Sequence, residues 1–206
     1  MIYPLARQGV FWTVQGEGVM FGVPQVFVRF AGCDVGCAQC DTDYAVADRV
    51  GVREIVRRVG AECNGAKWVW LTGGEPTIHE LEPLVRELHR YGFLVALATA
   101  GERPVARGRG VTVATEGVDF VSVSPHRLDK WVQRRGSQLN VVPGLNGLAL
   151  ADLEGVDASG FDDRFVTPCW YAPAERAERV NECVEWVRAH PDWRLGIQAH
   201  KHWGVA

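Results

Sequence analysis

The sequence predicts an α/β fold: an incomplete, TIM-like barrel of about six parallel strands and three helices. Short strand-like segments alternate with segments of helical period along the 206 residues. A cysteine-rich loop and a Gly-Gly turn each follow a strand directly. Parallel sheets gather their functional groups at the carboxyl ends of the strands, so both turns belong at one edge of the sheet. The length suits one domain over residues 1–206.

The strand-like segments are rich in β-branched, aromatic and other apolar residues. In chain order they are residues 25–30, 67–71, 93–98, 120–122, 138–142, 164–166 and 194–199. The first runs into the cysteine loop, and the second ends at the Gly-Gly turn. Residues 101–118 and 143–162 are irregular and glycine-rich, and we expect them to be loops.

Three segments have apolar residues at helical spacing. They are residues 52–63, 79–91 and 173–190, and a proline near the start of the third favours a helix that begins there. The expected buried positions are Val52, Ile55, Val56 and Val59 in the first, Leu81, Leu84, Val85 and Leu88 in the second, and Val180, Cys183, Val184 and Val187 in the third. Together with the strands, these helices predict right-handed crossovers over a parallel sheet.

The composition is that of an ordinary globular protein. Hydrophobic residues make up 47% of the chain, and the net charge of −3 is spread along it. No basic stripe is present that would indicate a nucleic-acid partner. The sequence has no apolar run of membrane-spanning length and no signal-like run at its first residues. We therefore expect a cytoplasmic protein with neither a nucleic acid nor a membrane as partner.

Cys33, Cys37 and Cys40 form the pattern C-x3-C-x2-C. Three thiolates on one short loop can hold three irons of a [4Fe–4S] cluster and leave the fourth iron open for chemistry. A structural zinc site would need a fourth Cys or His at matching spacing, and none follows Cys40 nearby. The other cysteines are dispersed, and we expect small buried side chains rather than ligands at Cys63, Cys169 and Cys183.

The segment Gly73-Gly74-Glu75-Pro76 comes soon after the strand that ends at Leu71. By itself it indicates a strand-to-helix turn. Together with the cysteine loop it resembles the radical S-adenosylmethionine superfamily. That resemblance implies that the open iron chelates the methionine amine and carboxylate, and that the Gly-Gly-Glu-Pro segment holds the amine. It also implies that electron transfer from the reduced cluster yields a 5′-deoxyadenosyl radical.

Two further runs of sequence narrow the resemblance. They are Phe11-Trp12-Thr13-Val14-Gln15-Gly16-Glu17-Gly18, followed by Gly22-Val23-Pro24 and Phe27-Val28-Arg29, and the later run Gln198-Ala199-His200-Lys201. With the cysteine loop they resemble the 7-carboxy-7-deazaguanine synthase family over the whole chain. This implies a carbon–nitrogen lyase that converts 6-carboxy-5,6,7,8-tetrahydropterin to 7-carboxy-7-deazaguanine with loss of ammonia. It also implies three cofactors: a [4Fe–4S] cluster, S-adenosyl-L-methionine, which is regenerated, and Mg²⁺.

The same resemblance assigns residues to the site, with an N-terminal substrate-binding segment and a C-terminal closing tail. Cys33, Cys37 and Cys40 are the implied cluster ligands, and Thr42 is the implied magnesium ligand. The implied adenosylmethionine residues are Gln39, Asp41, Gly73, Gly74, Glu75, Gly101, Ser124, Pro125, His126, Thr167 and Pro168. The implied substrate residues are Val14, Gln15, Gly16, Glu17, Arg29, Thr99, His200 and the C-terminal carboxylate of Ala206. Arg29 suits the substrate carboxylate because its planar guanidinium can make two parallel hydrogen bonds.

The chain departs from the family pattern at three positions. Ala98 replaces the usual glutamate, His126 a lysine and Thr167 a glutamine. These departures suggest a divergent branch with an altered cofactor pocket.

For some residues the sequence leaves other roles open. Thr42 could cap a turn, Gln15 could belong to a polar turn, and His200 could be a core histidine. We expect core or surface positions, outside the site, for His79, His89, His190 and His202.

The residues also leave two other functions open. A glycyl-radical-enzyme activase shares the cysteine and glycine motifs, but it has no need of the two further runs. A non-catalytic iron–sulfur or zinc-binding module would bind metal without cleaving adenosylmethionine. For the leading function, the resemblance implies an electron donor such as flavodoxin or ferredoxin and a role in queuosine-type 7-deazapurine biosynthesis. An incomplete barrel leaves exposed edges, which favour a homodimer.

Overall fold

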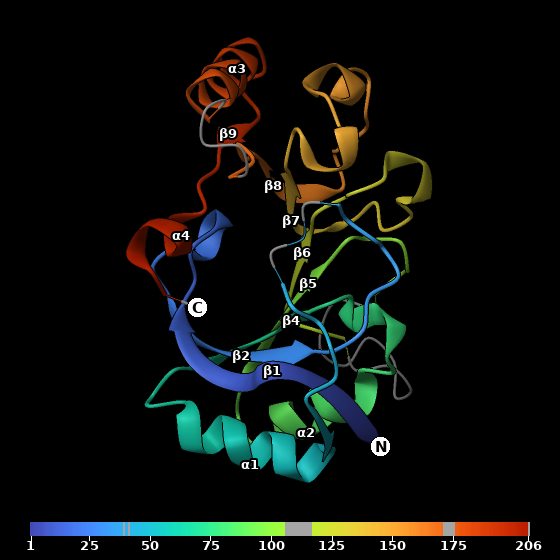
Figure 1. Cartoon of the computed structure of the whole chain (residues 1–206), viewed down its shortest axis with the longest axis vertical. Coiled ribbons are helices and arrows are strands. Elements are labelled where there is room, and N and C mark those ends of the chain that lie inside the picture. The colour runs from blue at the N-terminus through green and yellow to red at the C-terminus, as the bar shows by residue number, and fades with distance from the viewer. Residues whose placement is uncertain (39, 41, 106–116, 171–175, 206) are drawn as a thin grey trace.

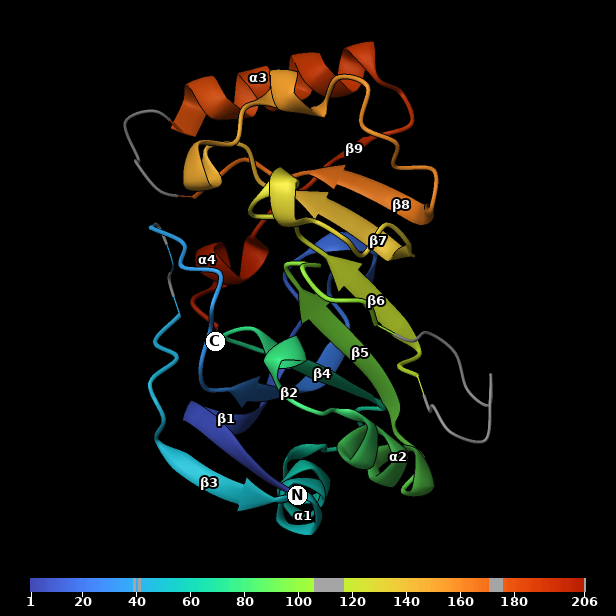
Figure 2. The ribbon, with the colours of Figure 1, turned by 90° about the vertical axis from the view of Figure 1, so that its right-hand side faces the viewer.

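One continuous sheet of nine strands organises the described part of the chain. The computed structural model describes residues 1–38, 40, 42–105, 117–170 and 176–205. In space the strand order is β3-β1-β2-β4-β5-β6-β7-β8-β9, which Figure 2 shows from the lower to the upper end of the molecule. The strands are β1 (Ile2–Val14), β2 (Pro24–Phe30), β3 (Asp48–Gly51), β4 (Trp68–Gly73), β5 (Leu94–Thr99), β6 (Phe120–Val123), β7 (Gly136–Val141), β8 (Phe161–Val166) and β9 (Arg194–Leu195).

The sheet is parallel over most of its width and antiparallel at one edge. Every neighbouring pair from β2 and β4 to β8 and β9 is parallel. β1 runs antiparallel to both β2 and β3. The sheet stays open, with β3 and β9 as its outer strands. The predicted α/β class with an incomplete barrel is confirmed, but the sequence reasoning missed β1 and β3.

β1 contains residues that argue against a strand. Pro4 and Gly9 both disfavour a strand interior. The pairing of β1 with β2 shifts its register between Leu5 and Val10, and Gln8 in that stretch has a positive φ of 59°. This bulge lets the chain remain paired in spite of the two breakers. The partners on both sides of β1 come from elsewhere in the sequence, so a local pattern does not reveal them.

The described residues contain four α-helices, α1 (Val52–Glu62), α2 (Glu82–Arg90), α3 (Arg176–Ala189) and α4 (Ala199–Trp203). The first three confirm the predicted helices. α2 begins later than the predicted residue 79, because Pro83 lies in its first turn and Pro76–Ile78 forms a separate 3-10 turn. Within the part that the structure describes, no helix is both long and apolar enough to cross a membrane.

Some predicted boundaries are wrong or fall outside the described residues. The predicted strand over 194–199 is a strand only at Arg194–Leu195, because the chain then turns away from the sheet and enters α4. The predicted loop over 143–162 contains short 3-10 turns, and its last two residues belong to β8. Most of the predicted loop over 101–118, and the first three residues of the predicted third helix, lie outside the described residues.

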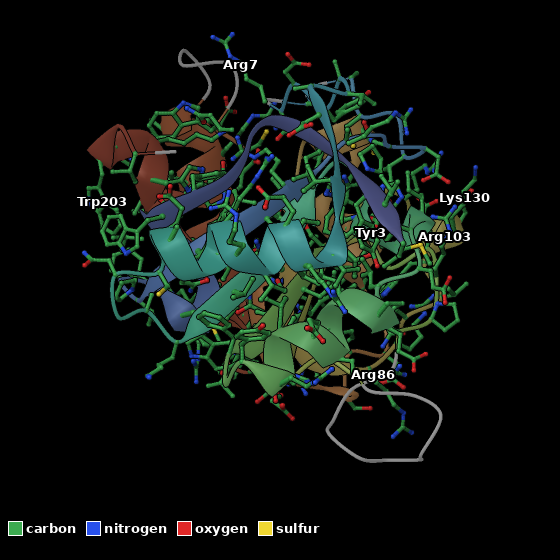
Figure 3. All side chains as sticks on the ribbon, turned by 90° about the horizontal axis from the view of Figure 1, so that it is seen from below. Tyr3, Arg7, Arg86, Arg103, Lys130 and Trp203 are labelled. Atoms are coloured by element: carbon green, nitrogen blue, oxygen red, sulfur yellow. The ribbon has the colours of Figure 1, made fainter. Side chains whose placement is uncertain are left out.

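Side chains alternate between the two faces of the sheet, as the pleat of a strand requires. In β2, Val26, Val28 and Phe30 are buried in the main core, on the face that α1 and α2 cover. Phe27 and Arg29 point to the other face, which we call the inner face. Figure 1 shows α1 and α2 beneath the sheet, and Figure 3 shows them next to one another from below.

The buried positions of α1 and α2 confirm the prediction except at Val52 and Leu81, which are half-buried, whereas those of α3 differ from it. The residues buried in the first two helices are Ile55, Val56, Val59, Leu84, Val85 and Leu88. In α3, Cys183 and Trp186 are buried, but Val184 is 41% exposed. Cys183 and Trp186 lie one turn apart on the helix, so they define the stripe that faces the core and leave Val184 outside it.

Leu84→Ala tests the packing of α2 on the sheet. Leu84 is fully buried in the main core, so its truncation should lower the free energy of unfolding by about 2–5 kcal/mol. The matched control on the same helix is Arg86→Ala, because the Arg86 side chain is 53% exposed and pairs with Glu82 one turn away. The control should cost at most about 0.5 kcal/mol. Urea unfolding measures both, and equal losses would contradict this account of α2.

Candidate active site

A cavity of about 450 Å³ lies on the inner face of the sheet. Its walls come largely from the carboxyl ends of β2, β4, β5, β6 and β7 and from the loops that follow them. The predicted site residues that line it are Val14, Gln15, Gly16, Glu17, Arg29, Cys33, Cys37, Cys40, Thr42, Gly73, Gly74, Glu75, Thr99, Ser124, His126 and His200. The fold therefore brings together residues that the sequence assigned to separate motifs.

The other predicted residues divide into two groups. Gly101, Pro125, Thr167 and Pro168 are described but do not line the cavity. Gly101 turns at a φ of +75°, and its carbonyl accepts two backbone hydrogen bonds from residues 132–133. The predictions for Gln39, Asp41 and Ala206 lie outside the described residues.

Sequence reasoning left many cavity residues unassigned. These are Phe27, Val35, Tyr44, Trp70, Thr72, Ala98, Ala100, Ser122, Gln138, Asn140, Val142, Leu145, Cys169, Gln198, Lys201 and Val205. The signal that could have found two of them is polar alternation in a buried strand. Gln138 and Asn140 alternate with the core residues Leu139 and Val141 along β7, so they must face the inner side.

The Gly-Gly turn is hydrogen-bonded to the residues that lead into the cysteine loop. The Gly74 N–H donates to Phe30 O, and the Glu75 N–H donates to Gly32 O, both at 3.0 Å. A Cβ at Gly74 would lie 1.8 Å from Gly32 O, and a Cβ at Gly73 would lie 2.2 Å from Phe30 O. Both positions must therefore be glycine, because the two main chains touch.

Charged residues hold the outer side of the same loop. Asp34, next to the first cysteine, forms an ion pair with Arg103, and this hydrogen-bonded guanidinium lowers the pKa of the Asp34 carboxyl. Arg127 donates to Asp34 O at 3.3 Å and to Glu102 Oε1 at 2.7 Å. These contacts connect the cysteine loop to the segments that follow β5 and β6.

The three cysteine thiols have different surroundings. Cys37 Sγ lies 2.8 Å from His126 Nδ1, and burial raises the pKa of the Cys37 thiol. The Cys40 thiol is exposed and donates to Thr42 O at 3.6 Å. Cys33 is half-buried. Cys169 is buried and packs in the same small apolar cluster as Cys37, together with Val142 and Leu145.

These cysteines fit an iron–sulfur cluster by their placement. A [4Fe–4S] cluster binds each thiolate at a different iron, so its ligands surround a shared space rather than converge on one atom. Cys33, Cys37 and Cys40 all line one cavity from one loop. Among the residues described, no three His, Cys, Asp or Glu side chains gather in the way that a single metal ion requires.

Glu75 connects two strand ends through its carboxylate. It is buried, and its Oε1 accepts from the hydroxyls of Thr77 at 2.6 Å and Thr99 at 2.7 Å. Its Oε2 accepts from the Ala100 N–H at 2.8 Å. A carboxylate oxygen has two lone pairs, so Oε2 keeps acceptor capacity for a ligand ammonium group.

The opening run and the C-terminal segment meet at the other end of the cavity. The Ala199 N–H donates to Gly16 O at 3.0 Å, and a Cβ at Gly16 would lie 2.6 Å from His200 N. Gln15 is buried, and its side-chain oxygen accepts from the Glu17 N–H at 3.2 Å. Gly16 therefore allows the C-terminal segment to pack directly on the turn that carries Gln15 and Glu17.

Glu17 accepts hydrogen bonds from two amides and lies near His200, and Arg29 lies on a separate wall. Asn140 Nδ2 donates to Glu17 Oε2 at 3.1 Å, and Gln198 Nε2 donates to Glu17 Oε1 at 3.0 Å. His200 Nδ1 lies 3.8 Å from Glu17 Oε1.

On the inner face of β2, the Arg29 guanidinium carbon lies 4.8 Å from the centre of the Phe11 ring, within cation–π range. The site thus contains an anionic group and a cationic group on different walls.

The chain is similar to known proteins over nearly its whole length, although no protein-family model matches it. A 7-carboxy-7-deazaguanine synthase from Bradyrhizobium diazoefficiens is 33% identical over 220 residues, covering 97% of this chain and 98% of the relative. The protein of that name from Bacteroides thetaiotaomicron is 33% identical and covers 93% of both chains. The one from Escherichia coli is 28% identical over the full length of both. A crystal structure of QueE from Escherichia coli matches with a TM-score of 0.74 and 25% identity, over 96% of this chain and 94% of that one.

Glu75→Gln tests the link between the ends of β4 and β5. The variant places an NH₂ group among donors that now face carboxylate oxygens, so at least one buried hydrogen bond must be lost. We expect the free energy of unfolding to fall by about 1–3 kcal/mol. Glu80→Gln is the control, since that side chain is exposed and its change should cost at most about 0.5 kcal/mol. If urea unfolding gives the same midpoint for both variants, the Glu75 carboxylate does not hold the two strand ends.

Proposed function

The chain belongs to the 7-carboxy-7-deazaguanine synthase family, whose enzymes act in 7-deazapurine biosynthesis, and from this premise we propose that it converts 6-carboxy-5,6,7,8-tetrahydropterin to 7-carboxy-7-deazaguanine with loss of ammonia. One observation carries the proposal. The cysteine loop, the Gly-Gly-Glu turn and the polar residues of the opening run all line one cavity. The proposed radical-generating residues and the proposed substrate residues would therefore share one space of about 450 Å³.

The residues on one side of the cavity suit the proposed cofactors. Cys33, Cys37 and Cys40 would hold a [4Fe–4S] cluster, which together with S-adenosyl-L-methionine supplies the radical chemistry when bound. Of the residues proposed for adenosylmethionine, Gly73, Gly74, Glu75, Ser124 and His126 line the cavity. Gly101, Pro125 and Pro168 do not line it, and Gln39 and Asp41 lie outside the described residues. Thr42 would offer a hydroxyl oxygen to Mg²⁺, which prefers oxygen ligands.

The residues on the other side suit a flat ring that carries a carboxylate. Arg29 would bind the carboxylate through its planar guanidinium. Glu17 would accept hydrogen bonds from the N–H groups at the opposite edge of the pterin. Phe27 and Trp70 stack with ring centroids 6.2 Å apart on the inner face, and both line the cavity. They offer an apolar surface for the ring.

The backbone of the opening run and the C-terminal segment would complete the substrate site. Val14, Gln15 and Gly16 would offer backbone and amide groups, while Thr99 and His200 would add side-chain contacts. Lys201 and Val205 line the cavity as well. The C-terminal segment would thereby reduce the access of water to the reacting atoms. The proposed contact of the Ala206 carboxylate belongs to the same tail.

We also propose a flavodoxin or ferredoxin as electron donor, a homodimer, and a cytoplasmic location. The homodimer is supported by the two outer strands of the open sheet and by exposed aromatic side chains. Trp12, Phe21 and Trp203 are each more than 40% exposed. The rings of Phe21 and Trp203 contact each other at a centroid distance of 5.1 Å, so they form one apolar patch.

An anaerobic assay tests the proposed function. The reconstituted, reduced protein is given adenosylmethionine, Mg²⁺ and 6-carboxy-5,6,7,8-tetrahydropterin, and mass spectrometry follows 7-carboxy-7-deazaguanine. We expect product to form while adenosylmethionine is regenerated. Metal binding without cleavage of adenosylmethionine would support a non-catalytic module instead. Cleavage without product, together with modification of a partner protein, would support an activase.

Substitution of single cysteines tests the cluster ligands. Cys33→Ala, Cys37→Ala and Cys40→Ala should each remove the cluster and the activity, because three thiolates are the minimum that leaves one iron open. Cys169→Ala is the sharpest control, since Cys169 lines the same cavity and packs in the cluster with Cys37. It should retain iron and the visible spectrum, as should Cys63→Ala and Cys183→Ala. Loss of iron in any of these three would show a missed ligand.

Arg29→Lys tests the contact with the substrate carboxylate. Lysine keeps the charge but cannot make the planar two-point contact. One charged hydrogen bond contributes roughly 1.5–3 kcal/mol, so the affinity for the carboxypterin should fall about ten-fold or more. The affinity for adenosylmethionine should not change. Both affinities are measured on the same reconstituted variant, and equal losses would mean that Arg29 supports the sheet rather than the substrate.

A further inference from the structure

Three side chains from distant parts of the sequence form a hydrogen-bonded series behind the cavity. The Thr167 hydroxyl, just after β8, donates to Asn140 Oδ1 at 2.6 Å. Asn140 Nδ2, on the inner face of β7, donates to Glu17 Oε2 at 3.1 Å. Asn140 and Glu17 line the cavity, whereas Thr167 does not. The series therefore runs from Thr167, which does not line the cavity, to the Glu17 carboxylate, which does.

The Glu17 carboxylate determines which group donates and which group accepts in each hydrogen bond of this series. Ionised Glu17 can only accept hydrogen bonds, so Asn140 must present its NH₂ group to Glu17. The amide oxygen of Asn140 then faces Thr167, and the hydroxyl must donate to it. Asn140 and Thr167 are both buried, so water cannot easily replace a lost partner. Removal of the hydroxyl would leave the amide oxygen of Asn140 without this donor.

Two neutral amides donate to Glu17 from two sides, and His200 Nδ1 lies 3.8 Å from Glu17 Oε1. Asn140 approaches from the sheet, and Gln198 approaches from the segment before α4 at 3.0 Å. Amides orient a carboxylate without cancelling its charge, unlike an arginine. The oriented carboxylate can therefore accept two N–H groups from a ligand edge such as the amine and ring N–H of an aminopyrimidinone.

We propose that Asn140 and Thr167 are positioning residues that hold Glu17 toward the aminopyrimidinone edge of a pterin, an inference that rests on the proposed function. Thr167 acts through Asn140 and does not touch the ligand. This role differs from the contact with adenosylmethionine that the family resemblance implies for residue 167.

The main chain after β9 packs against the Thr167 side chain and supports this role. A Cβ at Gly196 would lie 1.9 Å from the Thr167 hydroxyl oxygen, so the hydroxyl lies directly under that glycine. The Thr167 N–H donates to Val141 O at 2.8 Å, which continues the pairing of β8 with β7. The side chain is thus held beside β7 and next to Asn140.

Thr167→Val tests the inference, because valine keeps the shape and removes the donor. The probes are 6-carboxypterin and 6-carboxylumazine, which has an oxygen in place of the exocyclic amine. On the cluster-reconstituted enzyme, Thr167→Val should weaken binding of 6-carboxypterin about three- to ten-fold, the range for one neutral hydrogen bond. Binding of 6-carboxylumazine and of adenosylmethionine should stay as in the unsubstituted enzyme. Thr167→Ser restores the hydroxyl and should restore the preference for pterin.

Asn140→Asp is a second variant that does not depend on the first. It puts a carboxylate against Glu17, and like charges at that distance repel. We expect a larger loss of pterin preference than in Thr167→Val. Thermal unfolding of each variant shows that the protein remains folded during the binding measurements.

Four results would overturn the inference. The first is a loss of adenosylmethionine binding in Thr167→Val with unchanged pterin binding, which would place the hydroxyl on the cofactor side. The second is an equal loss for pterin and lumazine, which would indicate a general structural role. The third is failure of the unsubstituted enzyme to bind either 6-carboxypterin or the proposed tetrahydropterin substrate, which would overturn the proposed function as well. Unchanged pterin binding in both variants of a pterin-binding enzyme would refute the positioning role alone.

Discussion

The close approach of two main chains at the ends of β2 and β4 is the constraint on which the site depends. Gly73 and Gly74 press against the backbone of residues 30–32, with no room for a side chain at either position. This contact fixes the base of the cysteine loop relative to the turn that carries Glu75. Glu75 then accepts hydrogen bonds from the end of β5. One contact between main chains thus sets the positions of three adjacent strand ends.

The parallel sheet supplies the second half of the site through its pleat. Along β7, Leu139 and Val141 face the main core, while Gln138 and Asn140 face the inner side. Gln138 accepts from the Val19 N–H at 3.1 Å, and Asn140 holds Glu17. A single strand therefore contacts the opening run at Glu17 and the chain just after that run at Val19. Buried polar groups with defined partners of this kind make the position of a site specific as well as stable.

The sequence predicts those parts of the site whose chemistry is contained in a short run. The cysteine loop, the Gly-Gly-Glu turn and the opening run are each contiguous, and each lines the cavity. Gln138, Asn140 and Gln198 were not predicted. Alternation along β7 could place the first two on the inner face, but their partners come from distant parts of the chain that only the topology brings together. β1 was missed for a related reason, since Pro4 and Gly9 oppose a strand locally and its partners come from elsewhere.

The three positions at which the sequence is expected to depart from the family pattern have partners within this chain. Thr167 donates to Asn140, and His126 lies 2.8 Å from the Cys37 thiol. Ala98 packs with the apolar group that includes Met20 and Trp70 on the inner face. At residues 126 and 167 a shorter side chain, in place of lysine or glutamine, can be held by the protein rather than extend toward a ligand. The structure thus gives His126 and Thr167 polar partners within the chain and gives Ala98 an apolar one.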